Sequence, residues 1–171
     1  MSALRETELL SGLMRRELPV PEIGPAIVRL AKSLVDRQEV AALKPAVAQY
    51  LDHPDDWVRH EAVWYLGVWA RAREYEAILL EVAAADRNPD IRSFAAFGLG
   101  KLCRGGQASM LTVQTLARMV EDETQDRLLR LSAYGSLLEI VRGVSDLDFV
   151  TYDKDLPDVD WEWVRSLGSP E

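Results

Sequence analysis

Apolar residues recur every three or four positions along most of the chain, which is the spacing of one face of an α-helix. Two stretches show this spacing most clearly. Their apolar positions are Val58, Ala62, Tyr65, Leu66 and Trp69 in the first and Ile91, Ala95, Leu99 and Leu102 in the second. The pattern predicts amphipathic helices that bury one stripe of side chains and leave the opposite side in water.

The two stretches are copies of one motif. Residues 52–67 align with residues 86–100 after a gap of one residue, and the shared positions lie 33 residues apart. Those positions are Val58 and Ile91, Arg59 and Arg92, Ala62 and Ala95, Leu66 and Leu99, and Gly67 and Gly100. A weaker third copy follows after 38 residues at Leu129, Arg130 and Ala133, with Leu138 where the glycine is expected.

Proline and acidic residues divide the pattern into pairs of helices. The first helices of three pairs are expected at residues 40–51, 75–85 and 109–121, and another pair is expected upstream at 3–18 and 25–36. One pair cannot bury its apolar stripe alone, so neighbouring pairs must stack. The sequence therefore predicts an all-α fold, a short right-handed α-solenoid of about four antiparallel helix pairs over residues 1–145.

The repeated pattern Asp-x-x-Pro-x-x-Val-Arg-x-x-Ala-x-x-x-Leu-Gly resembles HEAT repeats, especially the short HEAT-like repeats also found in phycobilisome lyases. In that family the aspartate of the turn and the arginine of the helix usually form a structural ladder. By this resemblance the ladder consists of Arg59, Arg92 and Arg130 with the turn acids Asp56, Asp90 and Asp126. We therefore assign these charges to architecture and not to chemistry.

A second row of side chains lies on the flank of each repeat's second helix, away from the buried stripe. In the first copy the row is Trp57, Glu61, Trp64 and Val68; in the second it is Asp90, Phe94, Phe97 and Lys101; in the third it is Leu128, Ser132, Gly135 and Glu139. Placed side by side, these rows would line a concave face. Partly exposed aromatic side chains are typical anchors for a protein partner.

We therefore expect partner contacts at Trp57, Glu61, Trp64, Val68, Phe94, Phe97 and Lys101. The structural alternative is that each of these side chains packs against the adjacent repeat, because helices of a solenoid touch neighbours on both flanks.

Residues 146–171 differ from the rest because they contain eight acids against Lys154 and Arg165. A short helix is expected after Asp160, and its apolar side chains at Trp161, Val164 and Leu167 could dock on the last repeat as a cap. Alternatively, the carboxylates of this segment could meet a basic partner.

The composition, with 48% hydrophobic residues among 171 and a net charge of -8, is typical of a folded acidic protein. The acidity argues against nucleic acid as a partner, since phosphate backbones are bound by clustered Lys and Arg. No signal peptide and no membrane-spanning segment are predicted, and Cys103 is the single cysteine. We expect a cytoplasmic monomer without membrane contact.

The sequence offers little for catalysis or metal binding. The two histidines, His53 and His60, are too few for a metal site by themselves, and Cys103 lies about one repeat away from them. The motif Gly98-Leu-Gly100 lacks the third glycine of a phosphate-binding loop, and Asp153-Lys-Asp155 lacks the glycine and glutamate of a calcium loop. We predict no catalytic residue, no metal and no cofactor.

These observations favour a non-catalytic protein-binding module, either an adaptor or an inhibitor. A sharper hypothesis of the same class is an immunity-type inhibitor that covers a basic toxin such as a nuclease. A hypothesis of another class, which follows from the resemblance, is a phycobilin-lyase-like protein that handles a chromophore. DNA binding is disfavoured by Glu61, Asp90 and Glu139 on the proposed rows.

Overall fold

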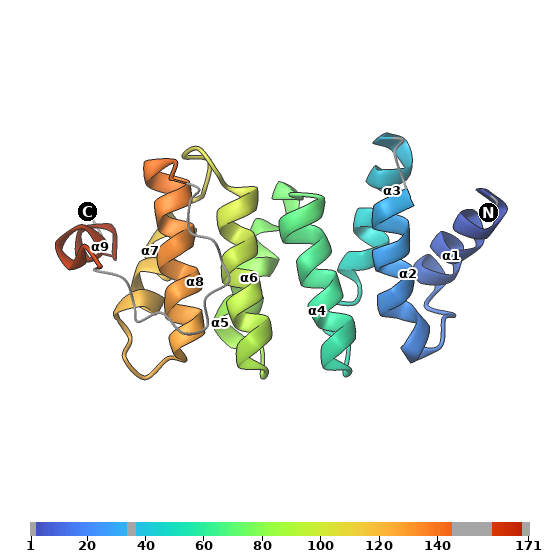
Figure 1. Cartoon of the computed structure of the whole chain (residues 1–171), viewed down its shortest axis with the longest axis horizontal. Helices are drawn as coiled ribbons and strands as arrows, with labels where there is room; N and C mark the ends of the chain where they lie inside the picture. Colours follow the sequence, from blue (N-terminus) through green and yellow to red (C-terminus); the bar gives the residue numbers. More distant parts are fainter. Residues whose placement is uncertain (1–2, 34–36, 145–158, 169–171) are drawn as a thin grey trace. The chain divides into compact units, whose positions relative to one another are not determined.

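The computed structural model describes residues 3–33, 37–144 and 159–168 (Figure 1). All regular structure in these residues is helical, so the predicted all-α repeat fold is confirmed. The chain forms two compact units, residues 1–72 and 73–171. Each unit buries apolar side chains from its own helices.

The first unit contains four α-helices: α1 (Ala3–Arg15), α2 (Val20–Ser33), α3 (Arg37–Ala48) and α4 (Asp56–Trp64). A π-helical turn, η1 (Tyr65–Trp69), continues α4. The helix α2 packs between α1 and α4 (Figure 1), and α1 also packs on α3. The largest fully buried side chains of the first unit are Tyr50, Leu13, Ile27, Leu30, Leu43 and Leu66.

The helix α2 begins earlier than the sequence predicts. Its first residue is Val20 and not Pro25, which lies inside the helix. A proline inside a helix removes one backbone hydrogen bond, but Pro25 is on the exposed side, where water can reach the freed carbonyl. The prediction that a proline marks the helix start is therefore wrong here.

The second unit begins with a 3₁₀ turn, η2 (Arg73–Tyr75), and continues with α5 (Glu76–Ala85), α6 (Pro89–Leu102), α7 (Met110–Glu121) and α8 (Arg127–Leu137). A second π-helical turn, η3 (Leu138–Arg142), extends α8, and α9 (Trp161–Gly168) ends the described chain. The helix α6 packs against α5 and α8, and α7 packs against α8 and α9.

Polar residues of the turns start the helices by capping them. A side-chain oxygen at an N-cap accepts a hydrogen bond from a backbone N–H that the helix cannot satisfy itself. The caps and the nitrogens that donate to them are Asp55 and Val58 (3.2 Å), Asn88 and Asp90 (2.9 Å), Ser109 and Thr112 (3.1 Å), and Asp126 and Leu128 (2.8 Å). These caps explain why each repeat places a short polar residue before its helix.

The helices α6 and α8 approach each other closely at Gly100. A Cβ atom at this position would lie 2.6 Å from Ser136 Oγ and 2.9 Å from Ser136 Cα. The hydroxyl of Ser136 also donates to the carbonyl of Ala96 at 2.8 Å. The glycine of the repeat motif thus provides room for the next repeat's backbone.

The helix α9 packs against α7 in the second unit, and its Val164 has no exposed surface. The Trp163 ring meets Tyr134 edge-on with centroids 6.3 Å apart, and Arg142 Nη2 pairs with Asp160 Oδ2 at 2.7 Å. The hydrogen bond from Arg142 is the main reason that the pKa of Asp160 lies below its usual value. Residues 146–158 and 169–171 of the predicted acidic segment lie outside the described residues.

Candidate functional site

Arg59 of α4 is almost completely buried and holds the turn before its own helix. Its guanidinium donates to the carbonyl of His53 at 2.8 Å and lies 2.8 Å from Asp56 Oδ1. A buried cation requires such partners because it has lost its hydration. The contacts of Arg59 thus join the start of α4 to the turn before it.

In the second unit, Arg92 and Arg130 bind the carbonyl groups at the ends of the preceding helices. Arg92 Nε donates to Ala83 O at 3.2 Å, and Arg130 Nε donates to Val120 O at 2.9 Å. The side chain of Arg92 also donates to Gln125 of the next repeat. The two turn acids of the predicted ladder serve the helix starts instead, with Asp126 as the cap of α8 and Asp90 in the first turn of α6.

The link from Arg92 continues through the turn after α7. Gln125 Nε2 donates to Asp122 Oδ2 at 2.7 Å, and Thr124 Oγ1 donates to Asp122 Oδ1 at 2.6 Å. These hydrogen bonds, that of Thr124 first, hold the pKa of Asp122 below its usual value. Gln125 and Asp122 are connecting residues that the sequence did not reveal, because the longer third repeat shifts the turn.

The predicted aromatic row of α4 is partly exposed. The Trp57 side chain is the most accessible, with 58% of its surface exposed, while Trp64 and Val68 are partly buried. His60 lies between the two indoles: its ring is 5.4 Å from Trp57 and 6.3 Å from Trp64, with interplanar angles of 17° and 14°. The three rings form one stacked row along the helix.

Glu61, which we expected in this row as a partner contact, is buried, with 6% of its surface exposed. Its carboxylate lies 3.4 Å from His60 Nδ1, and its Cγ faces Gly24 of α2. The helix α2 packs on α4 and covers this position, so Glu61 is not available to a partner in this structure. A helical wheel of α4 alone could not show which flank of this helix α2 covers.

Gly24 makes room for the exposed indole of Trp57. A Cβ atom on Gly24 would lie 2.6 Å from Trp57 Nε1 and 2.9 Å from Trp57 Cδ1. Glycine inside a helix costs about 1 kcal/mol relative to alanine. The close contact with Trp57 gives a physical reason for a glycine at this position of α2.

The π turn after α4 changes which residues face outward. The amide of Ala70 donates to Tyr65 O at 2.8 Å, five residues back, where an α-helix would bond four residues back. Each residue of such a turn rotates the chain by a smaller angle around the helix axis than a residue of an α-helix does. The apolar residues of the turn therefore no longer line up with the buried stripe. Trp69, predicted to be buried, is therefore 39% exposed, whereas Tyr65 and Leu66 before it are buried.

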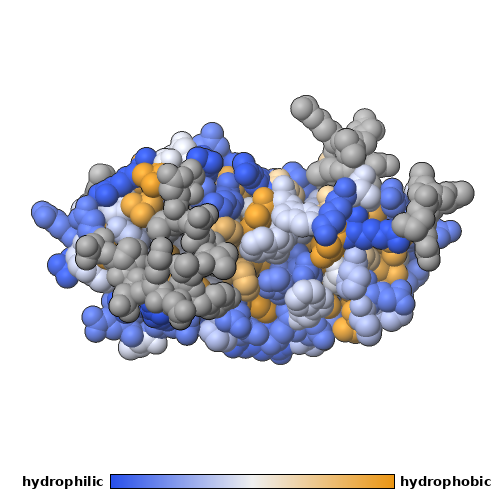
Figure 2. All heavy atoms as spheres, in the orientation of Figure 1, coloured by the Kyte–Doolittle hydropathy of each residue, from blue (hydrophilic) through white to orange (hydrophobic). Residues whose placement is uncertain are grey.

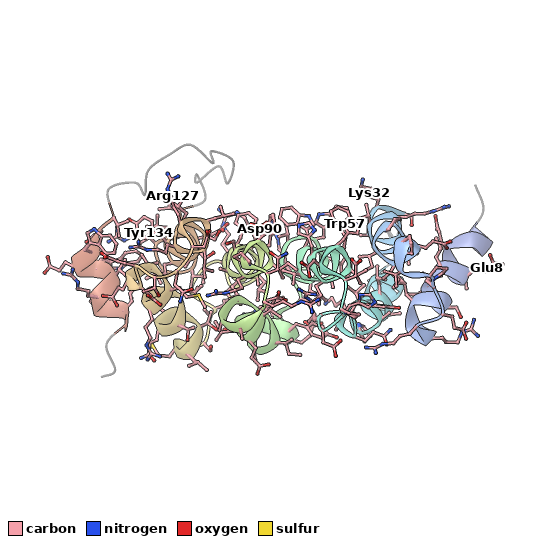
Figure 3. All side chains as sticks on the ribbon, turned by 90° about the horizontal axis from the view of Figure 1, so that it is seen from below. Glu8, Lys32, Trp57, Asp90, Arg127 and Tyr134 are labelled. Carbon is pink, nitrogen blue, oxygen red and sulfur yellow. The ribbon has the colours of Figure 1, made fainter. Side chains whose placement is uncertain are left out.

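A groove lies on the surface of α2 next to Trp57, and we call it the α2 groove. Its volume is about 710 Å³, and the residues that line it include Glu6, Pro25, Val28, Arg29, Lys32 and Trp57. Figure 3 shows Lys32 and Trp57 on the same side of the first unit, and Lys32 Nζ also lies 6.0 Å from the ring centroid of Trp69. In the space-filling view, apolar and hydrophilic residues lie side by side over α2 and α4 (Figure 2).

Sequence reasoning missed the cations of this groove. Arg29 and Lys32 are three residues apart on α2, a spacing that places two side chains on one helix face. This spacing could have indicated a positively charged face on α2. However, the sequence did not show which face of α2 lies beside Trp57.

The corresponding row of α6 in the second unit is more enclosed. Phe94 and Phe97 are partly buried, and Lys101 Nζ lies 4.8 Å from the centroid of the Phe97 ring. Lys101 also pairs at 3.0 Å with Glu139, a buried carboxylate that η3 supplies. Lys101 thus has an ion-pair partner within its own unit, whereas Trp57 presents most of its surface to solvent.

A family model for HEAT repeats matches residues 43–138, which is more than half of the chain. The chain belongs to the HEAT-repeat family. The resemblance expected from the repeat motif is thus confirmed. HEAT repeats generally mediate contacts with other proteins and are typically not catalytic. Neither the comparison with curated proteins nor that with solved structures found a match.

The thiol of this HEAT protein is buried beside a carboxylate. Burial and the charge of Glu76 raise the pKa of Cys103 to about 12, so the thiol stays protonated at neutral pH. Burial alone would raise the pKa of Glu76, but hydrogen bonds from Thr112 and Ser109 lower it below its usual value. The carboxylate joins the start of α5 to the start of α7 through Thr112 Oγ1 at 2.6 Å and Ser109 N at 2.8 Å.

Two further properties concern the part of the HEAT chain that the structure describes. Within it, no group of three or more His, Cys, Asp or Glu side chains is arranged to hold a metal ion. Among the helices of residues 3–33, 37–144 and 159–168, none is long and apolar enough to cross a membrane.

Proposed function

We propose that this HEAT-repeat protein is a non-catalytic module, an adaptor or an inhibitor, that binds another protein through the faces of its second helices. The observation that carries the proposal is the exposure of Trp57. An indole that presents 58% of its surface to water is an unfavourable arrangement that a partner can remove by burying it. Tryptophan is also among the commonest residues at which binding energy concentrates.

The surroundings of Trp57 support the proposal because they hold the indole in place. Its ring stacks on His60 at 5.4 Å and lies against the backbone of Gly24. A side chain held in one position loses little conformational entropy when a partner binds, so more of the contact energy is available for affinity.

An inhibitor of a basic toxin is the version that the charge distribution favours. The first unit has ten acidic and nine basic residues, whereas residues 73–171 have eighteen acidic and eleven basic ones. Such an uneven distribution speeds association with a partner of opposite charge.

The proposal is tested by using the purified full-length chain as bait in a lysate of the source cells, with mass spectrometry of the bound proteins. The variant Trp57→Ala should lose the partner, with an affinity at least about tenfold lower, because a buried indole is worth 2 kcal/mol or more. Leu111→Ala is the matched control, since Leu111 is 61% exposed on α7, a first helix. Equal capture of all proteins by wild type and Trp57→Ala would refute the proposal.

We also propose that residues 159–168, the part of the C-terminal segment that the structure describes, form a cap on the last repeat. The support comes from α9, which packs against α7; its Val164 is buried and its Trp163 contacts Tyr134 of α8. A terminal repeat otherwise leaves an apolar face in water, and capping removes that cost.

A further inference from the structure

The α2 groove combines an apolar floor with positive charge at its edge. Pro25 and Val28 of α2 and the Trp57 indole of α4 supply apolar surface. Arg29 and Lys32 follow on the same helix face, one turn along α2. A ligand that fits must therefore present apolar atoms and anionic groups within a few residues of each other.

The positive charge of the groove is available to a ligand. Neither Arg29 nor Lys32 pairs with a carboxylate among the residues that the structure describes, although Lys32 lies over the Trp69 ring. Glu6 of α1 is the one carboxylate lining the groove in the described residues, so cations outnumber anions there. Apolar walls reduce the screening of such charges and strengthen their attraction for an anion.

The local charge differs from that of the whole chain, whose net charge is -8. A long nucleic acid backbone needs many clustered cations, and it would meet Glu6 in this groove. A carboxylate-bearing polypeptide needs only two cations and can supply the apolar side chain for Trp57. The groove is also open along α2, which suits a polypeptide segment better than an enclosed small molecule.

We infer that the α2 groove binds an acidic segment of a protein partner, one that places an aromatic or aliphatic side chain against Trp57 and Val28 and its carboxylates against Arg29 and Lys32. The inference rests on the proposed protein binding through Trp57, not on the inhibitor version of that proposal, and it specifies the chemistry of the segment that docks in the groove. It differs from the basic partner that the net charge of the chain suggested.

The experiment is a selection from a library of random peptides displayed on phage, with the immobilised full-length chain as the target. Enriched peptides should combine Asp or Glu with Trp, Phe or Leu, and their binding should weaken as salt rises. The double variant Arg29→Glu and Lys32→Glu should bind these peptides at least about tenfold more weakly. The same variant should enrich peptides with Lys or Arg in a selection of its own.

A matched control separates the groove from the net charge. Arg87→Glu with Arg118→Glu changes the charge of the chain by the same amount at exposed positions of the second unit, and it should retain the acidic peptides. Thermal melting shows whether each variant folds. If the glutamate variant does not fold, Arg29→Gln with Lys32→Gln gives the same test with a smaller change.

Several results would overturn the inference. Enrichment of basic peptides, of purely apolar peptides, or of no peptide at all would do so, as would acidic peptides that bind the groove variant as well as wild type. Binding of single-stranded DNA that the groove variant loses would assign the groove to nucleic acid. Self-association that the groove variant abolishes would assign it to a second copy of the chain.

The failure of this inference can be told from the failure of the proposed function. If lysate capture depends on Trp57 but the selected peptides are not acidic, the protein is a binding module whose partner has another chemistry. If capture does not depend on Trp57, the proposed function itself fails. The proposed function and this inference are both supported only if acidic peptides are selected and their binding depends on Trp57 and on the two cations.

Discussion

The helices α4 and α6 carry the same repeat motif, 33 residues apart, but their surroundings differ. The shared positions are buried in both helices or nearly so: Val58 and Ile91, Ala62 and Ala95, and Leu66 and Leu99. The positions between them have diverged, with Trp57 exposed in the first unit and Asp90 at the equivalent place in the second. Repeated positions therefore maintain the fold, while the positions between them are free to acquire a function.

The packing of neighbouring helices also differs between α4 and α6. The helix α6 lies so close to α8 that Gly100 has no space for a side chain, and Lys101 is paired with Glu139. Beside α4, by contrast, the glycine of α2 makes room for an exposed indole. Close contacts stabilise the packing of the second unit, whereas part of the surface of the first unit stays exposed around Trp57.

The largest effect should come from removing the proposed cap of the second unit. Val164→Asp would place a charge where no surface is exposed, so α9 should leave α7. We expect a loss of about 3 kcal/mol in the free energy of unfolding, measured by urea denaturation, together with faster hydrogen exchange in residues 161–168. Unchanged exchange in α9 would contradict the cap. Trp161→Ala, at a more exposed position of α9, is the control.

A smaller loss is expected from Gly100→Ala. The new Cβ would lie 2.9 Å from Ser136 Cα, and because that atom is backbone, α6 and α8 must move apart. Overpacking of this kind costs about 1–3 kcal/mol, which thermal melting detects. Combining it with Ser136→Ala should not restore stability, since the clash with the backbone remains. A variant as stable as wild type would show that the two repeats are less tightly packed than described.

The smallest change in stability is expected from Gly24→Ala, the matching substitution in the first unit. Its Cβ meets the side chain of Trp57, at 2.6 Å from Nε1, and an exposed side chain can move aside. Alanine also gains about 1 kcal/mol of helix propensity, so the net change should stay within about 1 kcal/mol. Affinity for the partner should fall nevertheless, and the NMR signal of the Trp57 indole N–H should shift. A signal at the wild-type position would show that the indole is not held by Gly24.

Much of the fold could be predicted from the sequence because local signals determine it. Capping residues such as Asn88 and Ser109 precede several of the helices, and residues repeating at 33 positions mark the buried stripe. The candidate site was predicted only in part. Trp57 was identified from its place on the helix flank, whereas Glu61 on the same flank is buried by α2.

Two features of the site depended on contacts that no single helix reveals. The π turn at residues 65–69 shifts the phase of the helix, which moves Trp69 from the predicted stripe to the surface. Arg29 and Lys32 look like ordinary surface residues in the sequence, and their proposed role depends on the packing of α2 beside α4.

The sequence by itself determined the all-α fold, the repeat length and the buried stripe, because helix periodicity and capping are local properties that a chain encodes within a few turns. Only the tertiary structure decided which flank residues remain exposed and which cations gather beside them. The exposure of these residues depends on how neighbouring helices pack and on the room that Gly24 leaves for Trp57, and both involve residues from different helices. It also depends on a single π turn, which departs from the α-helical period.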